Sequence, residues 1–170
     1  MTKPAFAALV ERHSAELFAY LFRLTRDEAD AQDCLQEAYL RAHRAYGRLD
    51  EGANLRAWLY RIATNAAFSH LRRRRREAAW RAPADERWPA ADPSPPEQAA
   101  RRAQLAALAG AVERLPAQQR AALVLRQSQG LSYAETAAAL GCSEDAARAN
   151  VYQALKKLKE VFRDVTQDEI

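Results

Sequence analysis

Two parts of the sequence carry side chains suited to holding nucleic acid. One set combines two arginines, an amide and an aromatic ring at spacings of four, three and four residues: Arg61, Asn65, Phe68 and Arg72. A helix would place them on one face, where arginines hold phosphates, an amide bonds base edges and a ring stacks on an unpaired base. The arginine run Arg72–Arg76 adds charge for phosphates. We predict a single-strand DNA surface; the alternatives are a solvated helix end for the arginines and plain packing for Phe68.

The second part is Gly130–Leu155, "GLSYAETAAALGCSEDAARANVYQAL". Ser132 and Glu135 have the spacing of a capping box, Gly141 suits a left-handed helix end, and Ser143 can cap the next helix. Two short helices joined by about three residues with a glycine are typical of a DNA-binding helix-turn-helix. A helical hairpin that only packs is the alternative.

The second helix of this motif should face the major groove. Its candidate DNA contacts are Ser143, Arg148, Tyr152, Gln153 and Lys156. Arginine and glutamine bond base edges, whereas lysine suits phosphates. Glu144 and Asp145 favour the helix dipole but repel phosphate, so the base-reading signal is weaker than the fold signal.

A third polar face lies on the expected helix Glu28–Tyr46. Its members are Asp30, Asp33, Glu37, Arg41 and Arg44. Taken alone this face indicates ordinary helix electrostatics, with a Glu37–Arg41 pair worth only ~0.3–0.5 kcal/mol. The pattern offers no nucleophile, metal partner or pocket, so it does not indicate catalysis.

Helical periodicity, scarce glycine and a proline-rich join predict an all-α protein of two small helical domains. The 20-residue stretch 81–100 holds five of the seven prolines and should be a flexible linker between residues 1–80 and 101–170. The expected helices are Phe6–Leu24, Glu28–Tyr46, Leu55 to about Arg76, Arg101–Leu115, Ala117–Ser128, Tyr133–Leu140 and Glu144–Val165, with a loop over Gly47–Asn54.

Composition narrows the class of protein. The 170-residue chain has a net charge of +4, both helical blocks are basic, and the linker carries two basic and four acidic residues. The linker is either simply solvated or an acidic strand that occupies a nucleic-acid channel. Two lone cysteines, no apolar run of membrane length and no signal-peptide pattern favour a cytoplasmic protein without membrane insertion. We expect no enzyme activity, no metal site and no cofactor.

Three segments in this order resemble the extracytoplasmic-function sigma factors, the smallest sigma-70 class of bacterial RNA polymerase. Glu28–Ala42, "EADAQDCLQEAYLRA", resembles their region 2.2, and "LRAWLYRIATNAAFSHLRRRRR", Leu55–Arg76, resembles regions 2.3 and 2.4. Val112–Ser143, "VERLPAQQRAALVLRQSQGLSYAETAAALGCS", resembles the start of region 4. The resemblance covers nearly the whole chain except the linker.

The resemblance implies a role for each polar face. Core polymerase would bind the helix face of Asp30, Asp33, Gln36, Glu37 and Arg41. The −10 promoter strand would bind Arg48, Asn54, Arg61, Asn65, Phe68 and Arg72. The helix-turn-helix would read the −35 element, the linker would thread the polymerase channels, and an anti-sigma factor would hold the protein inactive.

The recognition helix departs from the family pattern. Where the family commonly has Gly-Thr-Val and then basic-Ser-Arg, this chain has Asp145-Ala146-Ala147 and Arg148-Ala149-Asn150. Two rival hypotheses follow. A sigma mimic would bind an anti-sigma factor without starting transcription, but it has no need of the arginine run. A dimeric helix-turn-helix regulator would leave the first block unexplained.

Overall fold

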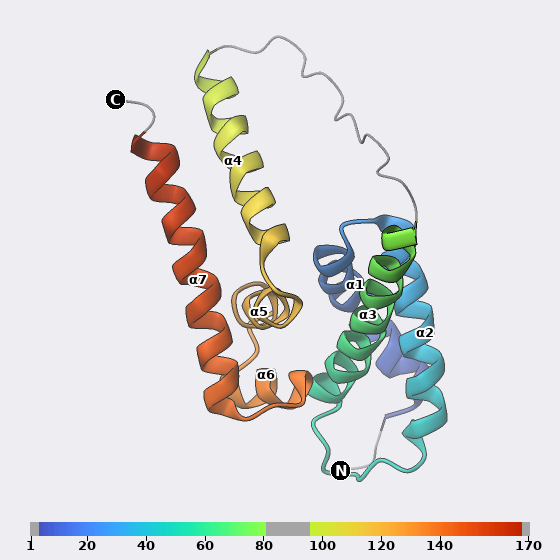
Figure 1. Ribbon diagram of the computed structural model, residues 1–170. Helices are drawn as coiled ribbons and strands as arrows, with labels where there is room; N and C mark the ends of the chain where they lie inside the picture. The colour runs from blue at the N-terminus through green and yellow to red at the C-terminus, as the bar shows by residue number, and fades with distance from the viewer. Residues whose placement is uncertain (1–3, 81–95, 168–170) are drawn as a thin grey trace.

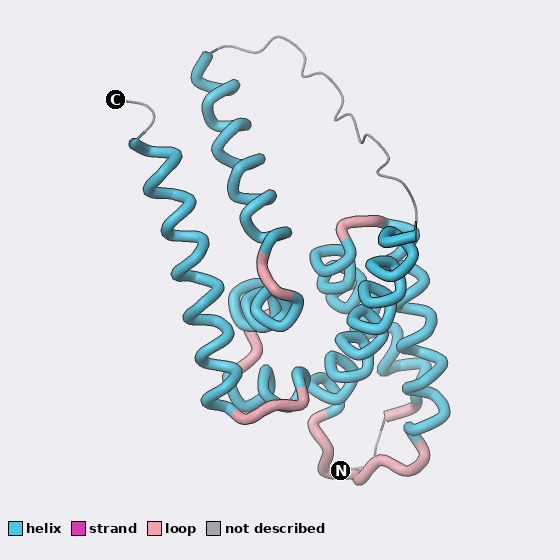
Figure 2. The backbone as a smooth tube through the Cα atoms, in the orientation of Figure 1, coloured by secondary structure: helices cyan, strands magenta, loops and turns pink. Residues whose placement is uncertain are grey.

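The computed structural model describes residues 4–80 and 96–167, and this part of the chain is helical without any strand (Figures 1 and 2). The elements are α1 Phe6–Thr25, α2 Glu28–Tyr46, α3 Leu55–Trp80, α4 Pro96–Arg114, α5 Ala117–Leu123, α6 Tyr133–Leu140 and α7 Glu144–Gln167. A π-helical turn, Val124–Ser128, continues α5. The all-α prediction is confirmed.

Two helices extend further than expected. α3 continues to Trp80, since arginine is a good helix former and carries the helix through the basic run. α4 begins at Pro96, inside the stretch expected to be linker, because proline is tolerated at the first helical position. Residues 81–95, the rest of the acidic segment expected to thread a channel, lie outside the described residues.

Helices α1, α2 and α3 form an N-terminal bundle (Figure 1). Small residues line the buried side of α2, which lets its neighbours approach closely: Ala31, Cys34, Ala38 and Ala42. The larger side chains come from α1, among them Leu17, Leu21 and Tyr20. The Tyr20 hydroxyl lies 2.7 Å from the Thr64 hydroxyl of α3, so its buried polar atom is satisfied.

Helices α4 to α7 form a C-terminal bundle, in which α4 and α7 run side by side and α6 turns into α7 (Figure 1). The predicted caps are confirmed. Ser132 and Glu135 make a reciprocal capping box, Gly141 is left-handed with φ 66°, and the Ser143 hydroxyl accepts from the backbone N–H of Ala146 at 3.2 Å. Local chemistry therefore specifies the helix-turn-helix.

The two bundles share one hydrophobic core. Leu125 and Leu131 of the C-terminal bundle are fully buried in the same cluster as Leu21 and Leu59 of the N-terminal bundle. In Figure 1, α6 lies next to the start of α3 and α5 lies beside the N-terminal bundle. Sequence patterns indicate two domains but do not reveal this packing.

We predict that Leu21→Ala destabilises the fold by ~2–5 kcal/mol, because it leaves a cavity at a side chain with 0% exposure. The matched control is Leu40→Ala, since Leu40 is 51% exposed. Urea unfolding followed by circular dichroism measures both. Similar midpoints for the two variants would contradict the assignment of Leu21 to the core.

Candidate nucleic-acid and polymerase interface

The predicted strand-binding face exists as a face of α3. Arg61, Asn65 and Arg72 are exposed along one side of the helix, and Arg72 donates to the Ser69 hydroxyl at 3.2 Å. Phe68 is half-buried and packs against the hydrophobic core. Its ring therefore presents less surface for base stacking than the spacing alone suggests. Binding of DNA to this face stays a prediction.

The loop between α2 and α3 holds two predicted DNA contacts, Arg48 and Asn54, which differ in their surroundings. Arg48 is exposed in the turn after α2. Asn54 caps α3, because its Oδ1 accepts from the backbone N–H of Ala57 at 3.0 Å. Its Nδ2 donates to Glu135 Oε1 of the helix-turn-helix at 3.0 Å. Both polar ends of this amide are used within the protein.

Four of the five predicted polymerase contacts form an exposed patch on α2: Asp33, Gln36, Glu37 and Arg41. Within it, Arg41 Nε donates to Glu37 Oε1 at 2.6 Å. Leu40 adds an exposed apolar side chain beside them, which reasoning from charge alone missed although its position between Glu37 and Arg41 was readable.

The fifth residue, Asp30, faces α3 instead. Its side chain is only 19% exposed, and its Oδ1 lies 3.1 Å from His70 Nε2. Arg74 pairs with its other carboxylate oxygen. The spacing correctly puts Asp30 on α2, but the structure uses it to join α2 to α3. We therefore assign it to packing between these helices, and polymerase docking by the exposed four stays a prediction.

The recognition-helix residues are exposed, and the most prominent is held by neighbours. Arg148 Nη2 donates to Glu144 Oε1 at 2.5 Å, and its guanidinium carbon lies 4.3 Å from the ring centroid of Tyr133. The Arg126 guanidinium contacts the same ring at 4.9 Å. Tyr133, which directly follows the capping Ser132, was missed by sequence reasoning because no contact with α7 is visible in a local pattern.

The other predicted DNA-contact residues at α7 differ in whether their polar atoms already bond within the protein. Tyr152 is 65% exposed, and Gln153 and Lys156 are exposed beside it. Ser143 uses its hydroxyl for the helix cap. A serine cap at the helix start still leaves the backbone N–H groups of the first turn, which favour a phosphate.

Two carboxylates with lowered pKa values, Glu135 and Glu16, lie near the place where the two bundles meet. The pKa of Glu135 lies below its ordinary value because the backbone N–H of Ser132 donates to its carboxylate, helped by the amide of Asn54. Glu16 is partly buried, which alone would raise its pKa. Hydrogen bonds from Arg56 and His13 outweigh that burial and lower the pKa. Both carboxylates therefore stay charged at neutral pH.

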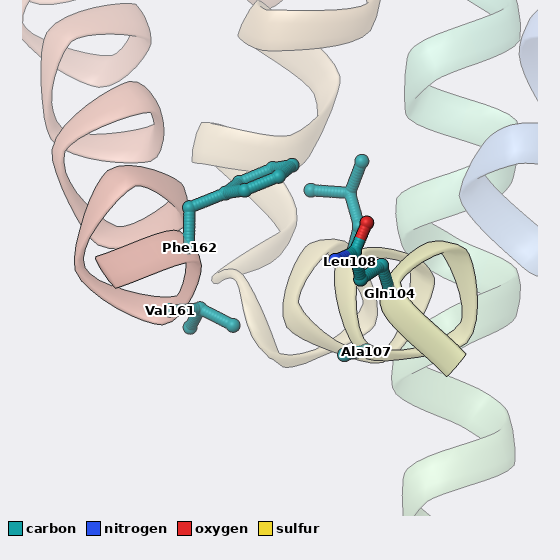
Figure 3. A pocket seen from close by; sticks show the side chains of 5 residues that line it. All are labelled: Gln104, Ala107, Leu108, Val161 and Phe162. Atoms are coloured by element: carbon teal, nitrogen blue, oxygen red, sulfur yellow. The ribbon is translucent and has the colours of Figure 1, made fainter. Parts of the chain in front are cut away.

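The cavities among the described residues differ widely in size. The crevice between α4 and α7, where the Phe162 ring of α7 extends toward Leu108, holds about 10 Å³ (Figure 3). Larger hollows lie elsewhere: one of about 310 Å³ between α2 and α3, and one of about 430 Å³ along α7. No group of three or more metal-ligating side chains occurs within the described ranges, and burial raises the pKa of the Cys34 thiol to about 11. None of the helices in those ranges is long and apolar enough to cross a membrane.

These features define a two-bundle helical protein that ends in a capped helix-turn-helix, and the comparisons place it in a family. Residues 9–77 match Sigma-70 region 2, and residues 105–158 match Sigma-70 region 4. The chain is 36% identical over 158 residues to the ECF RNA polymerase sigma factor SigM of Mycobacterium tuberculosis, covering 93% of this chain and 77% of SigM. The chain belongs to the extracytoplasmic-function (ECF) sigma factors.

Two further likenesses agree with this assignment. Over 159 residues the chain is 35% identical to the ECF sigma factor SigE of Mycolicibacterium smegmatis, covering 92% of this chain but only 61% of SigE. Among solved structures, the sigma factor RpoE from Bartonella quintana, in complex with the anti-sigma factor NepR, superposes with a TM-score of 0.70 at 26% identity. That superposition covers 93% of this chain and 96% of RpoE, so the likeness includes both bundles.

We predict that Glu135 titrates below an ordinary glutamate in a carboxyl NMR titration. The stabilisation from its ionised form is present above the unfolded-state pKa and is lost as the pH falls through the lower folded-state pKa. Asn54→Ser removes the amide bond to Glu135, so it should raise the midpoint toward that of an ordinary glutamate. The rise should be partial because the Ser132 N–H still donates to Glu135. Serine can still cap α3, so the variant keeps this helix start. An ordinary midpoint in the unaltered protein would contradict the capping-box electrostatics.

Proposed function

We propose that this chain binds bacterial core RNA polymerase, directs it to promoters that have −10 and −35 elements, and initiates transcription. The observation that carries the proposal is the presence of sigma regions 2 and 4, in order, in one chain with exposed polar faces on both. The protein would supply promoter specificity, and the polymerase would supply the chemistry.

We assign core-polymerase docking to the exposed patch of α2. The patch mixes carboxylates, an amide, Arg41 and the exposed Leu40, which suits an interface with a polar rim around an apolar contact. It lies on a rigid helix whose other side is buried against α1 and α3. A partner bound there would leave the outer face of α3 accessible.

We assign the −10 strand to the outer face of α3 and to the loop that precedes it. Arg61 and Arg72 are placed to hold phosphates about three helical turns apart, with the Asn65 amide between them for a base edge. The half-buried Phe68 would offer an edge of its ring to a base. Arg48 extends the basic surface into the loop.

We assign the −35 duplex to the start of α7. The bond from Arg148 to Glu144 leaves the guanidinium partly exposed, with 54% of its side chain accessible. Glu144 and Tyr133 can thus orient this arginine toward a guanine edge in the major groove. Lys156, two turns further on, suits a flanking phosphate.

An anti-sigma factor is the proposed regulatory partner. The support is the likeness of the whole chain to the sigma factor bound by NepR. A sigma mimic would also bind an anti-sigma factor but would not start transcription. A transcription assay therefore distinguishes a sigma factor from a mimic.

The deciding experiment is run-off transcription with purified core polymerase and a promoter library randomised across the −10 and −35 regions. Enrichment of defined motifs among the transcripts establishes sigma activity. Binding to core polymerase without any transcript would sink the proposal and favour the mimic.

We predict that Asn65→Ala impairs promoter opening more than it impairs binding to core polymerase. The change removes an exposed amide without touching the core, whereas Phe68→Ala would also remove packing. Permanganate reactivity of unpaired thymines measures opening, and co-purification measures binding. Gln32→Ala, an exposed amide on α2, is the control. Equal losses in both assays would argue against strand capture.

We predict that Arg148→Ala weakens binding to the enriched −35 duplex by ~1–3 kcal/mol, as expected for loss of a bidentate base contact. Arg148→Lys keeps the charge and loses the planar fork, so it should restore little of the binding. Fluorescence anisotropy with the full chain measures both. Full rescue by lysine would show that Arg148 contacts only phosphate.

A further inference from the structure

Three arginines from different helices gather around one glutamate. Arg26 follows the last residue of α1, Arg75 lies near the end of α3, and Arg120 belongs to α5. Arg26 Nε donates to Glu113 Oε1 of α4 at 2.9 Å, and Arg120 Nη1 donates to the Glu113 backbone carbonyl at 3.3 Å. In Figure 1 the ends of α1 and α3 lie at the same end of the N-terminal bundle. We call Arg26, Arg75 and Arg120 the arginine cluster.

Arg120 is the buried member of the arginine cluster. The residue is 7% exposed, and its Nε has no hydrogen-bond partner among the residues that the structure describes. The bond from its Nη1 to the carbonyl near the end of α4 is longer than usual, so it compensates the charge only in part. Burial lowers the pKa of this guanidinium, the Glu113 carboxylate raises it, and the charges of Arg75 and Arg26 lower it further. Arginine nonetheless stays protonated in proteins, and a buried cation is stabilised by an anion beside it.

The arginine cluster carries more positive charge than its surroundings neutralise. Within the described ranges, Glu113 is the one carboxylate that acts on Arg120, and it already accepts from Arg26. Three guanidinium charges against one carboxylate leave an excess of two positive charges. Donors remain available as well, because the bond to Glu113 uses Arg26 Nε and leaves the Nη fork of a side chain that is 41% exposed. Arg75 is exposed beside it.

We propose that the arginine cluster binds the phosphoryl group of a small ligand, either inorganic phosphate or the terminal phosphate of a nucleotide. A phosphate dianion has the charge that balances the cluster, and the planar forks of arginine match its oxygens. A small ligand is favoured over a nucleic-acid backbone because the innermost guanidinium, that of Arg120, is nearly covered by its neighbours. The proposal rests on these contacts and not on the promoter function.

A bound phosphate has a measurable consequence for stability. A ligand that binds the folded chain and not the unfolded chain raises the melting temperature as its concentration rises. Salt also screens the repulsion among the arginines, so the ionic strength has to be held constant during the titration. A rise in melting temperature at constant ionic strength then reports binding of the phosphate itself.

The test titrates the full chain with inorganic phosphate and, separately, with adenosine diphosphate, at an ionic strength fixed with potassium chloride. Isothermal titration calorimetry measures the affinity. The loss variant is Arg26→Gln/Arg75→Gln, which changes exposed side chains and leaves the buried Arg120 in place. The matched control, Arg23→Gln/Arg76→Gln, removes two exposed arginines from the same two helical segments and makes the same change in net charge.

A second variant should change the affinity in the opposite direction. Glu113→Gln removes a charge that repels phosphate, while the amide oxygen can still accept from Arg26 Nε. It should tighten binding by about five-fold, whereas the loss variant should weaken binding by about ten-fold or more. Damage to the fold cannot produce tighter binding. The control for this change is Glu11→Gln, an exposed glutamate of α1, which should leave the affinity within about two-fold.

The two ligands also identify the source of the phosphoryl group. Tighter binding of adenosine diphosphate supports the site with a nucleotide as its ligand, and equal affinities support it with inorganic phosphate. No binding of either ligand would overturn the proposal, as would equal losses in the loss variant and its control. An unchanged affinity of Glu113→Gln would place the ligand elsewhere. Single-stranded DNA that depends on Arg26 and Arg75 for binding, when neither small ligand binds, would overturn the proposal in favour of a nucleic-acid contact.

Discussion

The packing of α3 against helices from both bundles is the constraint on which the rest of the structure depends. Its inner surface carries alanines, Ala63, Ala66 and Ala67, all buried, and these small residues allow close approach of neighbouring helices. With its inner surface covered by α1 and α2 and its start covered by α6, α3 leaves one long side outward. Arg61, Asn65 and Arg72 occupy that side, so core packing determines where the basic surface lies.

The parts of the fold that were predictable from the sequence depend on contacts between residues close together in the chain. The helix limits depend on contacts within a few residues, such as the Ser132–Glu135 box and the left-handed Gly141, and these are written locally in the sequence. The ion pair Glu37–Arg41 is likewise an i,i+4 contact. Four of the α2 patch residues and the three polar residues of the α3 face are exposed as the helical period predicts.

What was missed depends on contacts between distant residues. Asp30 has the spacing of a surface residue, yet His70 and Arg74, 40 and 44 residues later, turn it into a partly buried link between α2 and α3. Phe68 fits a stacking pattern, but its ring fills a place against the core. The meeting of Asn54 with Glu135 spans 81 residues. Periodicity reports which side of a helix is apolar and carries no information on which distant helix will cover it.

The recognition helix shows how an apparent conflict in sequence can be resolved by geometry. Glu144 and Asp145 disfavour phosphate when considered as charges at a helix start, yet Glu144 is bonded to Arg148 one turn later. This pair is exposed on both sides, so its contribution to stability is small. Its consequence is orientation: the guanidinium is held between a carboxylate and the Tyr133 ring, so in the proposed −35 contact it would lose fewer conformations on meeting a base. An acid at this position is therefore compatible with a helix that reads DNA.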